Sequence, residues 1–128
     1  MHILNLSTKG RTGMIKINDL VQAAVVDMKL NQGIVTIYCP HSTAGITINE
    51  SDDPAVQRDI LHRLDDLVPL NLDYEHHENN SDAHIKASLI GSSVQVFVEE
   101  GTVRLGQWQA IYFCEFDGPR NRELWLNH

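Results

Sequence analysis

Apolar residues fall into short runs along this chain, and in most of these runs they alternate with polar residues. Such runs, bounded by Gly, Asn, Asp or Ser, are typical of β-strands. The run over 107–116 is largely apolar on both faces, which predicts a strand that is buried on both sides. We expect about seven strands, over residues 3–6, 14–17, 34–38, 45–49, 94–98, 107–116 and 122–126.

Three other stretches have a helical period and predict two longer helices and one short helix. In the second stretch, the Asp53 carboxylate can accept from free backbone amides, and Pro54 at the first helical position loses no hydrogen bond. Pro69 ends that helix. The expected caps are Asn18 or Asp19 for the first helix, Asp53 for the second, and Asn80 or Ser81 for the short third helix, which runs to Gly91.

The length of 128 residues suits a single domain over residues 1–128. Because strands dominate the C-terminal half and helices lie between the earlier strands, the predicted fold class is α+β. The two cysteines, Cys39 and Cys114, lie in or beside apolar strands. We expect them to be small, reduced core residues, as in the reducing cytosol.

Acidic residues outnumber basic ones, with 17 Asp and Glu against 10 Lys and Arg and a net charge of −7. Nucleic-acid binding needs basic residues gathered on one face, so we expect no nucleic-acid partner. The N-terminus lacks the charged flank and apolar length of a signal peptide, and no run approaches 18 apolar residues. These features predict a cytoplasmic protein without a membrane partner.

Histidines are concentrated in two polar stretches, 39–50 and 74–84, the first of which interrupts predicted sheet. Neutral imidazole is a common zinc ligand, and catalytic zinc sites often use three protein ligands and leave one position open. The candidates are His41, His76 and His84. The chain has no HExxH motif and no Cys pair at zinc spacing, so a second interpretation stays open. In it, His76 is a solvated loop residue, His41 bonds its own turn and His84 caps a helix start.

Hydroxyl, amide and basic side chains near these histidines could bind an anionic ligand such as a phosphate. Arginine suits this role because its guanidinium can bind two oxygens at once. For each candidate the alternative is an ordinary half-buried strand residue or a solvated surface charge. The candidates are Ser42, Thr43, Thr47, Asn49, Lys86, Arg120 and Arg122.

Glu50 ends the strand that follows His41, where it could act as a general base or orient a water at the metal. Its alternative role is a charge near a helix N-terminus. Cys39 lies two positions before His41, so in a continuous strand both side chains would share one face. Reactive Cys-His pairs are rare, and we expect no nucleophilic role for Cys39.

Several separated motifs follow one another over nearly the whole chain. They are His-Ser-Thr-Ala-Gly-Ile-Thr-Ile-Asn-Glu at 41–50, Asp53-Pro54, Tyr74, His76, His84-Ile-Lys86, Gly91, Gly-Gln-Trp-Gln at 106–109, Arg120 and Arg122. Together they resemble the YjbQ family of small bacterial and archaeal proteins. The resemblance is specific because it joins many motifs in order.

The resemblance implies an α+β fold with its strands in two packed sheets, assembled as a homotrimer. It also implies a divalent metal bound by His41, His76 and His84, with Glu50 close to them. The activity that it implies is that of a thiamine-phosphate synthase, a transferase that joins a pyrimidine diphosphate to a thiazole phosphate with loss of pyrophosphate.

Three imidazoles suit Zn, Ni or Mn better than Mg, which prefers oxygen ligands. The leading hypothesis is therefore a metal-dependent enzyme, with Zn the first expectation and Mg, Mn or Ni as alternatives, that acts on a phosphorylated small molecule while Glu50 moves a proton. A metal-dependent hydrolase or lyase would use the same groups. The remaining alternative is a trimeric metal- or ligand-binding protein without turnover.

Overall fold

The computed structural model describes all residues, 1–128, and has the expected α+β composition. It contains eight strands where the sequence predicts seven. The additional strand covers only three residues and pairs with the preceding strand across a turn at Gly101, so it is too short to produce an alternating pattern. The elements are β1 His2–Ser7, β2 Gly13–Lys16, α1 Asn18–Asp27, β3 Gly33–Tyr38, β4 Ala44–Glu50, α2 Pro54–Leu67, α3 Ser81–Ile90, β5 Ser93–Glu99, β6 Thr102–Arg104, β7 Gln109–Glu115 and β8 Asn121–Asn127.

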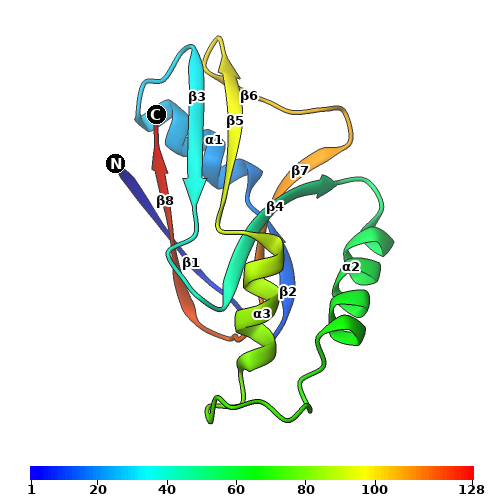
Figure 1. The fold of residues 1–128 in the computed structure, drawn as a ribbon. Coiled ribbons are helices and arrows are strands. Elements are labelled where there is room, and N and C mark those ends of the chain that lie inside the picture. Colours follow the sequence, from blue (N-terminus) through cyan, green and yellow to red (C-terminus); the bar gives the residue numbers. More distant parts are fainter.

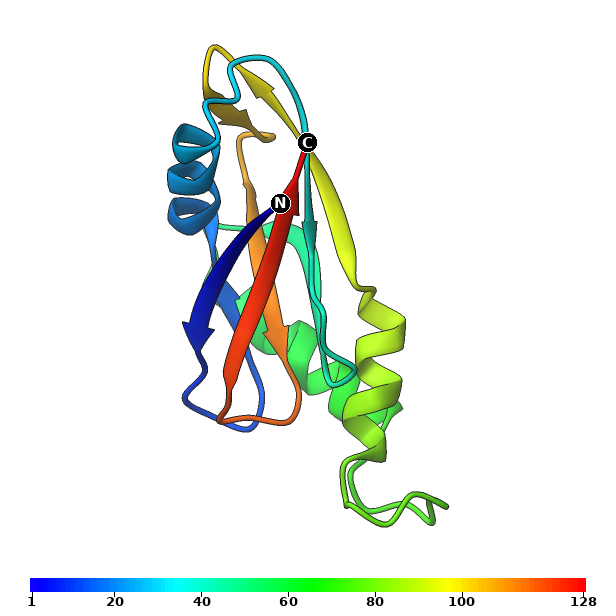
Figure 2. The ribbon, with the colours of Figure 1, turned by 90° about the vertical axis from the view of Figure 1, so that its left-hand side faces the viewer.

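The strands form two packed antiparallel sheets, as expected from the resemblance. A five-stranded sheet has the order β1-β8-β3-β5-β6, and a three-stranded sheet has the order β2-β7-β4 (Figure 1). Figure 2 shows the larger sheet from its open face, with the smaller sheet behind it and α1 along one edge. The main core fills the space between the sheets and α1, and Val25, Ile37, Ile46, Phe113 and Leu126 are among its fully buried residues.

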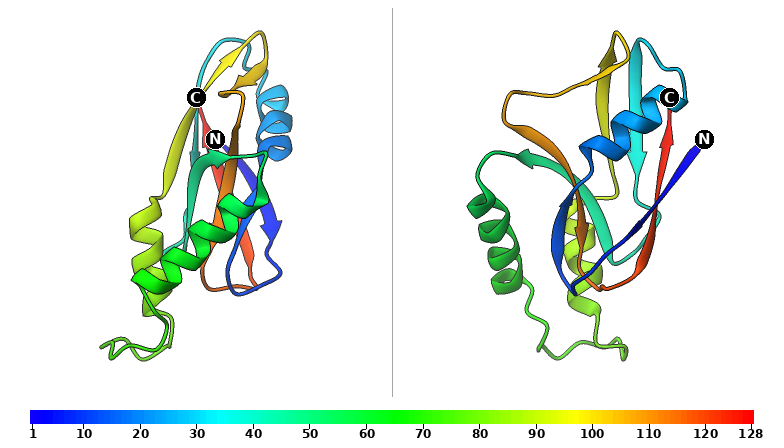
Figure 3. Two further views of the ribbon diagram at one scale, coloured as in Figure 1. Left: turned by 90° about the vertical axis from the view of Figure 1, so that its right-hand side faces the viewer. Right: turned by 180° about the vertical axis from the view of Figure 1, so that it is seen from behind.

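Strand β7 lies at the centre of the fold and is buried on both faces from Ala110 to Glu115, which confirms the prediction for this part of the run. Residues 107–109 are exposed, and the strand begins only at Gln109. Ile111 and Phe113 point into the main core. Ala110 and Tyr112 pack on the other face against α3 and α2, which lie over the outer side of the three-stranded sheet (Figure 3, left). Each face of β7 therefore carries a different part of the core.

Only one of the three predicted helix caps is present as expected. Asp53 caps α2 by accepting from the Ala55 amide at 2.9 Å. Asn18 is the first residue of α1 rather than its cap, because its side chain accepts from the Ile111 amide of β7 at 2.7 Å. Asn80 occupies the cap position of α3, but its side chain makes no capping hydrogen bond. The prediction of a short third helix was also wrong, since α3 has the same length, 10 residues, as α1.

Helix α2 is attached to the body mainly along one side. None of its residues is fully buried, although Leu61 and Leu64 pack against the cluster beneath the helix. Asp65 adds an ion pair to Lys86, a buried residue of α3. No helix of the protein combines the length and the apolar character needed to cross a membrane.

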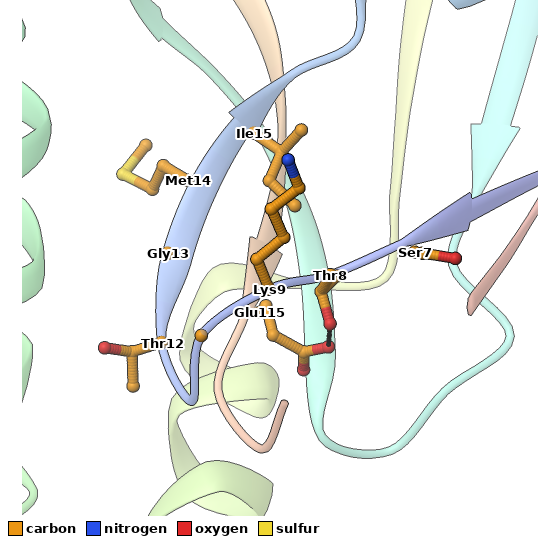
Figure 4. Close-up of a pocket in the computed structure, with 9 residues that line it drawn as sticks. Ser7, Thr8, Lys9, Thr12, Gly13, Met14, Ile15 and Glu115 are labelled. Carbon is orange, nitrogen blue, oxygen red and sulfur yellow. Dashed lines mark hydrogen bonds between the residues drawn. The ribbon is translucent and has the colours of Figure 1, made fainter. Parts of the chain in front are cut away.

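A buried ion pair between Glu115 and Arg122 connects the two sheets where β7 turns into β8. The Arg122 guanidinium binds both carboxylate oxygens of Glu115, and Thr8 donates to the same carboxylate at 2.7 Å (Figure 4). The amides of Phe116 and Asp117 donate to it at 3.1 Å. Burial alone would raise the pKa of Glu115, but these hydrogen bonds and the Arg122 charge hold it below its ordinary value.

We expect Glu115→Gln to lower the free energy of unfolding at pH 7 by about 3 kcal/mol, because the Arg122 charge would stay buried without a counter-charge. Urea denaturation measures this loss. A Glu115→Gln/Arg122→Met double variant should lose less than the sum of the two single variants. Additive losses would show that the two side chains do not stabilise the fold as a pair.

The Glu115–Arg122 pair also makes the stability of the fold depend on pH. The folded pKa of Glu115 lies below its ordinary value of 4.5, so its contribution is complete above about pH 4.5 and is lost as the pH falls through the folded pKa. The stability of the Glu115→Gln variant should therefore change less between pH 5 and pH 3 than that of the wild type.

Candidate functional site

The candidate site is a polar hollow of about 330 Å³ between the β3–β4 loop, the start of α3 and the β7–β8 turn. These three segments meet at the lower end of the molecule in Figure 1. Hydrogen bonds hold both ends of the loop, because the Cys39 amide donates to the Ser92 carbonyl at 2.7 Å and the Phe116 amide to the Thr43 carbonyl at 3.2 Å. No hydrophobic side chain lines the polar hollow, whose residues are Pro40, His41, Ser42, Thr43, Glu78, Asn80, His84, Asp117, Arg120 and Arg122.

A second hollow of about 430 Å³ adjoins the polar hollow and shares His41, Ser42 and His84 with it. Its other lining residues are small: Ala44, Ala87, Ser88, Gly91 and Ser92. We call it the small-residue hollow. The two hollows together form a cleft with a charged half and a small-residue half.

Gly45 allows β4 and the end of α3 to approach each other closely beside this cleft. A Cβ atom at position 45 would lie 2.6 Å from the Gly91 carbonyl oxygen, closer than side-chain atoms tolerate. The Ile46 amide donates to the same carbonyl at 3.0 Å. Any side chain at position 45 would therefore push α3, and His84 with it, away from the β3–β4 loop.

His41 lies on the boundary of the two hollows and is bonded to β8 behind it. Its Nε2 atom accepts a hydrogen bond from the Glu123 amide at 2.9 Å. Burial lowers the pKa of His41 below its ordinary value, and the nearby Arg122 charge acts in the same direction. The imidazole is therefore neutral at pH 7 in this environment.

His84 stands in the first turn of α3 and lines three hollows, the third of which has a volume of about 500 Å³ and includes Tyr74 and His76. The rings of His76 and His84 meet edge to face, with centroids 5.3 Å apart. The structure thus places His84 between the other two candidate histidines, with a shared cleft on one side and a ring contact on the other.

The three histidines do not form one ligand set in this conformation. Two imidazoles bound to one zinc at about 2.0–2.1 Å place their ring centres roughly 5 Å apart, which the His76–His84 spacing matches. A neutral His41 whose Nε2 accepts from Glu123 has its proton on Nδ1 and no lone pair left for a metal. No group of three or more His, Cys, Asp or Glu side chains is arranged to hold a metal ion. The residues as they stand therefore do not fit a three-histidine site.

Both candidate arginines border the polar hollow, but one side chain is buried and the other is half exposed. Arg122 is buried, bound to Glu115, and donates to the Thr43 hydroxyl at 2.9 Å. Arg120 has a half-exposed side chain and pairs with Asp117 at 3.0 Å. Arg120 also donates to the Asp117 carbonyl oxygen at 2.8 Å. Of the two, Arg120 is the one that can turn to a ligand more readily, because its side chain is half exposed and that of Arg122 is buried.

Two further residues of the polar hollow, Asn80 and Asp117, are absent from the set predicted from the sequence. The Asn80 amide group donates to Asp117 at 2.9 Å, and its carbonyl oxygen is the single buried side-chain polar atom without a hydrogen-bond partner. Sequence patterns assign these residues to a helix cap and a turn. Only the packing of the β7–β8 turn against the start of α3 brings them together.

Several predicted residues lie outside the cleft. Glu50 is at the opposite end of β4 from Ala44, about 20 Å along the strand, and lines a separate hollow with Trp108. Within one chain it is therefore not close to the histidines, contrary to what the resemblance implies. Thr47 and Asn49 are on the same strand and line neither half of the cleft.

Lys86 belongs to an internal ion-pair network rather than to the cleft. Its side chain is buried and pairs with Asp65 and Asp82, while Arg11 binds Asp82 through both guanidinium nitrogens at 3.0 and 3.2 Å. Burial would raise the pKa of Asp82, but Arg11 and Lys86 together hold it below its ordinary value. The network ties α2 and the β1–β2 loop to α3.

Cys39 has no sign of nucleophilic activation. Both cysteines are free and buried, as expected, and burial raises the pKa of Cys39 to about 11. The side chain therefore remains a neutral thiol at pH 7, and the thiolate is the reactive form.

A separate cavity of about 230 Å³ lies between the end of β1 and β2 (Figure 4). It is lined by the Ser7–Gly10 loop and by Met14 and Ile15, with Glu115 at its edge. Thr8 and Arg122 already occupy the Glu115 carboxylate. None of the residues predicted for the site lines this cavity.

The sequence matches the family model described as UPF0047 protein YjbQ-like over residues 2–128. It is 47% identical to the UPF0047 protein YugU of Bacillus subtilis, with 96% of this chain and 94% of that protein covered. It is 34% identical to the UPF0047 protein YjbQ of Escherichia coli O157:H7, with 88% of this chain and 83% of that protein covered.

Solved structures agree with the fold. A crystal structure of an uncharacterized conserved YjbQ/UPF0047 protein from Clostridium acetobutylicum matches with a TM-score of 0.96 and 50% identity, covering 99% of this chain and 98% of that one. A conserved hypothetical protein from Thermus thermophilus matches with a TM-score of 0.92 and 38% identity, with the same coverage.

Proposed function

Because this chain belongs to the YjbQ (UPF0047) family, we propose a function for the cleft formed by the two hollows. We propose that the protein is an enzyme and that it binds a phosphorylated small molecule in this cleft. The observation that carries the proposal is that His41, Ser42 and His84 all line both halves of the cleft. A ligand that spans the cleft would therefore meet two imidazoles and a hydroxyl at the point where its charged and uncharged parts join.

The donor groups of the polar hollow support a phosphate in that half, although Glu78 and Asp117 also line it. Arg120 can offer two parallel N–H donors to phosphate oxygens, and Ser42 and Thr43 add hydroxyl groups. Arg122, whose charge is paired with Glu115, fixes the Thr43 hydroxyl from behind by donating to it. The non-phosphate part of the ligand would lie against the small side chains of the other hollow.

His84 is the group best placed to move a proton in this cleft. It lines both hollows, and its side chain has no hydrogen bond to the protein that would occupy a ring nitrogen. An imidazole can protonate a leaving oxygen or accept a proton near pH 7. Arg120 would stabilise the negative charge that develops on a departing phosphate or pyrophosphate.

Transferases, hydrolases and lyases could all use His84 to move a proton and Arg120 to stabilise a departing anion. In the thiamine-phosphate synthase reaction that the resemblance implies, a thiazole nitrogen attacks a pyrimidine methylene carbon, and the carbon–oxygen bond to pyrophosphate breaks. A phosphate-ester hydrolase or a lyase would also release an anion into the polar hollow. Binding without turnover is the alternative, and it would need Arg120 but not His84.

We expect Arg120→Met to weaken the binding of inorganic phosphate or pyrophosphate about tenfold, because a charge-assisted hydrogen bond is lost. Isothermal titration calorimetry measures the change. Arg104→Met is the matched control, since Arg104 is an exposed residue of β6, outside the cleft. Equal affinities of the wild type and Arg120→Met would contradict the assignment of the phosphate to the polar hollow.

The divalent metal expected from the resemblance stays a separate proposal, supported by the spacing of His76 and His84. It requires a third ligand in addition to these two histidines, because His41 Nε2 accepts from the Glu123 amide. The steps described above depend only on the residues of the chain.

If the metal binds, protein purified without a histidine tag should contain about one divalent ion per chain, and His84→Ala should lose it while its circular dichroism spectrum stays unchanged. Elemental analysis measures the content. His62→Ala is the control, because His62 is an exposed residue in the middle of α2. If no metal copurifies and a chelator leaves the melting temperature unchanged, the metal proposal is wrong.

We also propose the homotrimer implied by the resemblance. Ile3 and Tyr38 lie opposite Trp125 on neighbouring strands, and Ile34 lies opposite Phe97, so all five side chains share one face of the five-stranded sheet. Tyr38 and Trp125 stack with ring centroids 5.7 Å apart. Uncovered apolar surface of this kind marks interaction sites.

Sedimentation velocity at micromolar concentration should show a trimer for the wild type and smaller species for Phe97→Glu, because the charge would be buried between subunits. Leu72→Glu is the matched control, since Leu72 is an exposed leucine in the 68–80 loop, away from this sheet. A monomeric wild type would refute the trimer.

A further inference from the structure

We infer that His41 is a fixed hydrogen-bond donor, with its proton held on Nδ1 by the backbone of Glu123, and that it presents this N–H to an acceptor atom of the ligand. The first half of this inference concerns the free protein. The second half rests on the proposed function, because it needs a ligand in the cleft. It gives His41 a role different from the metal ligand that the resemblance implies.

The Glu123 amide decides which ring nitrogen carries the proton. A backbone N–H can only donate, and it lies 2.9 Å from His41 Nε2, so Nε2 must present its lone pair. The Glu123 carbonyl oxygen is also near Nε2, at 3.2 Å. A proton on Nε2 would satisfy this carbonyl but would leave the amide without its acceptor, so we assign the tautomer from the shorter contact.

His41 Nδ1 is the ring nitrogen left for a ligand. It has no hydrogen-bond partner within the protein, and it is not a buried unpaired atom, since the Asn80 side-chain oxygen is the only one of that kind. The atom is therefore not fully buried, and it belongs to a ring that lines both halves of the cleft. An unpaired N–H group in this place is ready to donate.

The surroundings keep the ring in this orientation. Glu123 is held in β8 by its pairing with Asn5 of β1, so its amide cannot turn away. The loop that carries His41 is anchored at Cys39 and Thr43, and Thr43 also accepts from Arg122. Both partners of the hydrogen bond thus belong to rigid elements, as preorganised ligand donors require.

The N–H group at Nδ1 of His41 limits which kinds of ligand group can lie beside it. An N–H donor favours phosphoryl, carboxylate or carbonyl oxygens and disfavours ammonium groups and metal ions at that position. The same hollow contains Arg120 and Arg122 but also the carboxylates of Glu78 and Asp117, so an anionic acceptor beside His41 would depend on Arg120 turning from Asp117 to the ligand. A phosphoryl oxygen is the acceptor that suits this exchange. His41 would then help to distinguish phosphorylated ligands from cationic ones.

The tautomer is tested in the free protein by nuclear magnetic resonance of ¹⁵N-labelled histidine. At pH 7 we expect His41 to show a protonated Nδ1, an unprotonated Nε2 and a coupling between Nε2 and the Glu123 amide across the hydrogen bond. A proton on Nε2 would overturn the inference, whether or not the protein binds phosphate.

The ligand contact is tested with two variants that imitate different ring nitrogens. The amide nitrogen of an asparagine side chain takes the place of Nδ1, whereas that of glutamine takes the place of Nε2. With inorganic phosphate as the probe, His41→Asn should bind within about threefold of the wild type, and His41→Gln should bind about tenfold more weakly. Melting temperatures of both variants show whether they fold.

The possible outcomes separate this inference from the proposed function. Equal weakening by His41→Asn and His41→Gln, with both variants folded, would overturn the donor role while phosphate binding itself stands. Loss of a bound metal in His41→Asn would likewise overturn it in favour of a ligand role. No phosphate binding by the wild type would refute the proposed function and the ligand contact, whereas the resonance measurement would still decide the tautomer.

Discussion

The Glu115–Arg122 ion pair is the interaction on which the arrangement of the candidate site depends. Both side chains are buried, and a buried charge is tolerated only when a counter-charge and hydrogen bonds surround it. The pair draws together the end of β7 in one sheet, the start of β8 in the other, and Thr8 from the first loop. The turn between β7 and β8 therefore has little freedom, and its polar side chains face the cleft.

The cleft follows from this constraint together with the close approach of α3 to β4. Glycine at position 45 permits that approach, and the Arg11–Asp82–Lys86 network holds α3 in place from the other side. Most charged groups near the cleft are consequently paired with one another. The imidazoles of His41 and His84, the hydroxyl of Ser42 and the half-exposed Arg120 are the groups left to meet a ligand.

The histidines illustrate how residue type and residue role can differ. Three imidazoles in a chain that resembles the YjbQ family predict a metal site. In the folded chain, His76 and His84 lie at a spacing that suits two ligands, but the backbone of β8 has already taken the lone pair of His41. The Glu123 amide therefore makes His41 a hydrogen-bond donor, whereas His76 and His84 can still act as metal ligands.

Periodicity and local hydrogen bonding act between near neighbours in the chain, so the sequence pattern was enough to predict the α+β class, seven of the eight strands, the cap of α2 and the double burial of β7. It also indicated His41 and His84 as candidate metal ligands and Ser42 and Arg120 as candidates for binding an anion. Only the tertiary structure decided that Lys86 is an internal ion-pair residue, that Glu50 lies at the far end of β4, and that Asn80 and Asp117 meet. Those outcomes depend on contacts between residues distant along the chain, which local pattern does not encode.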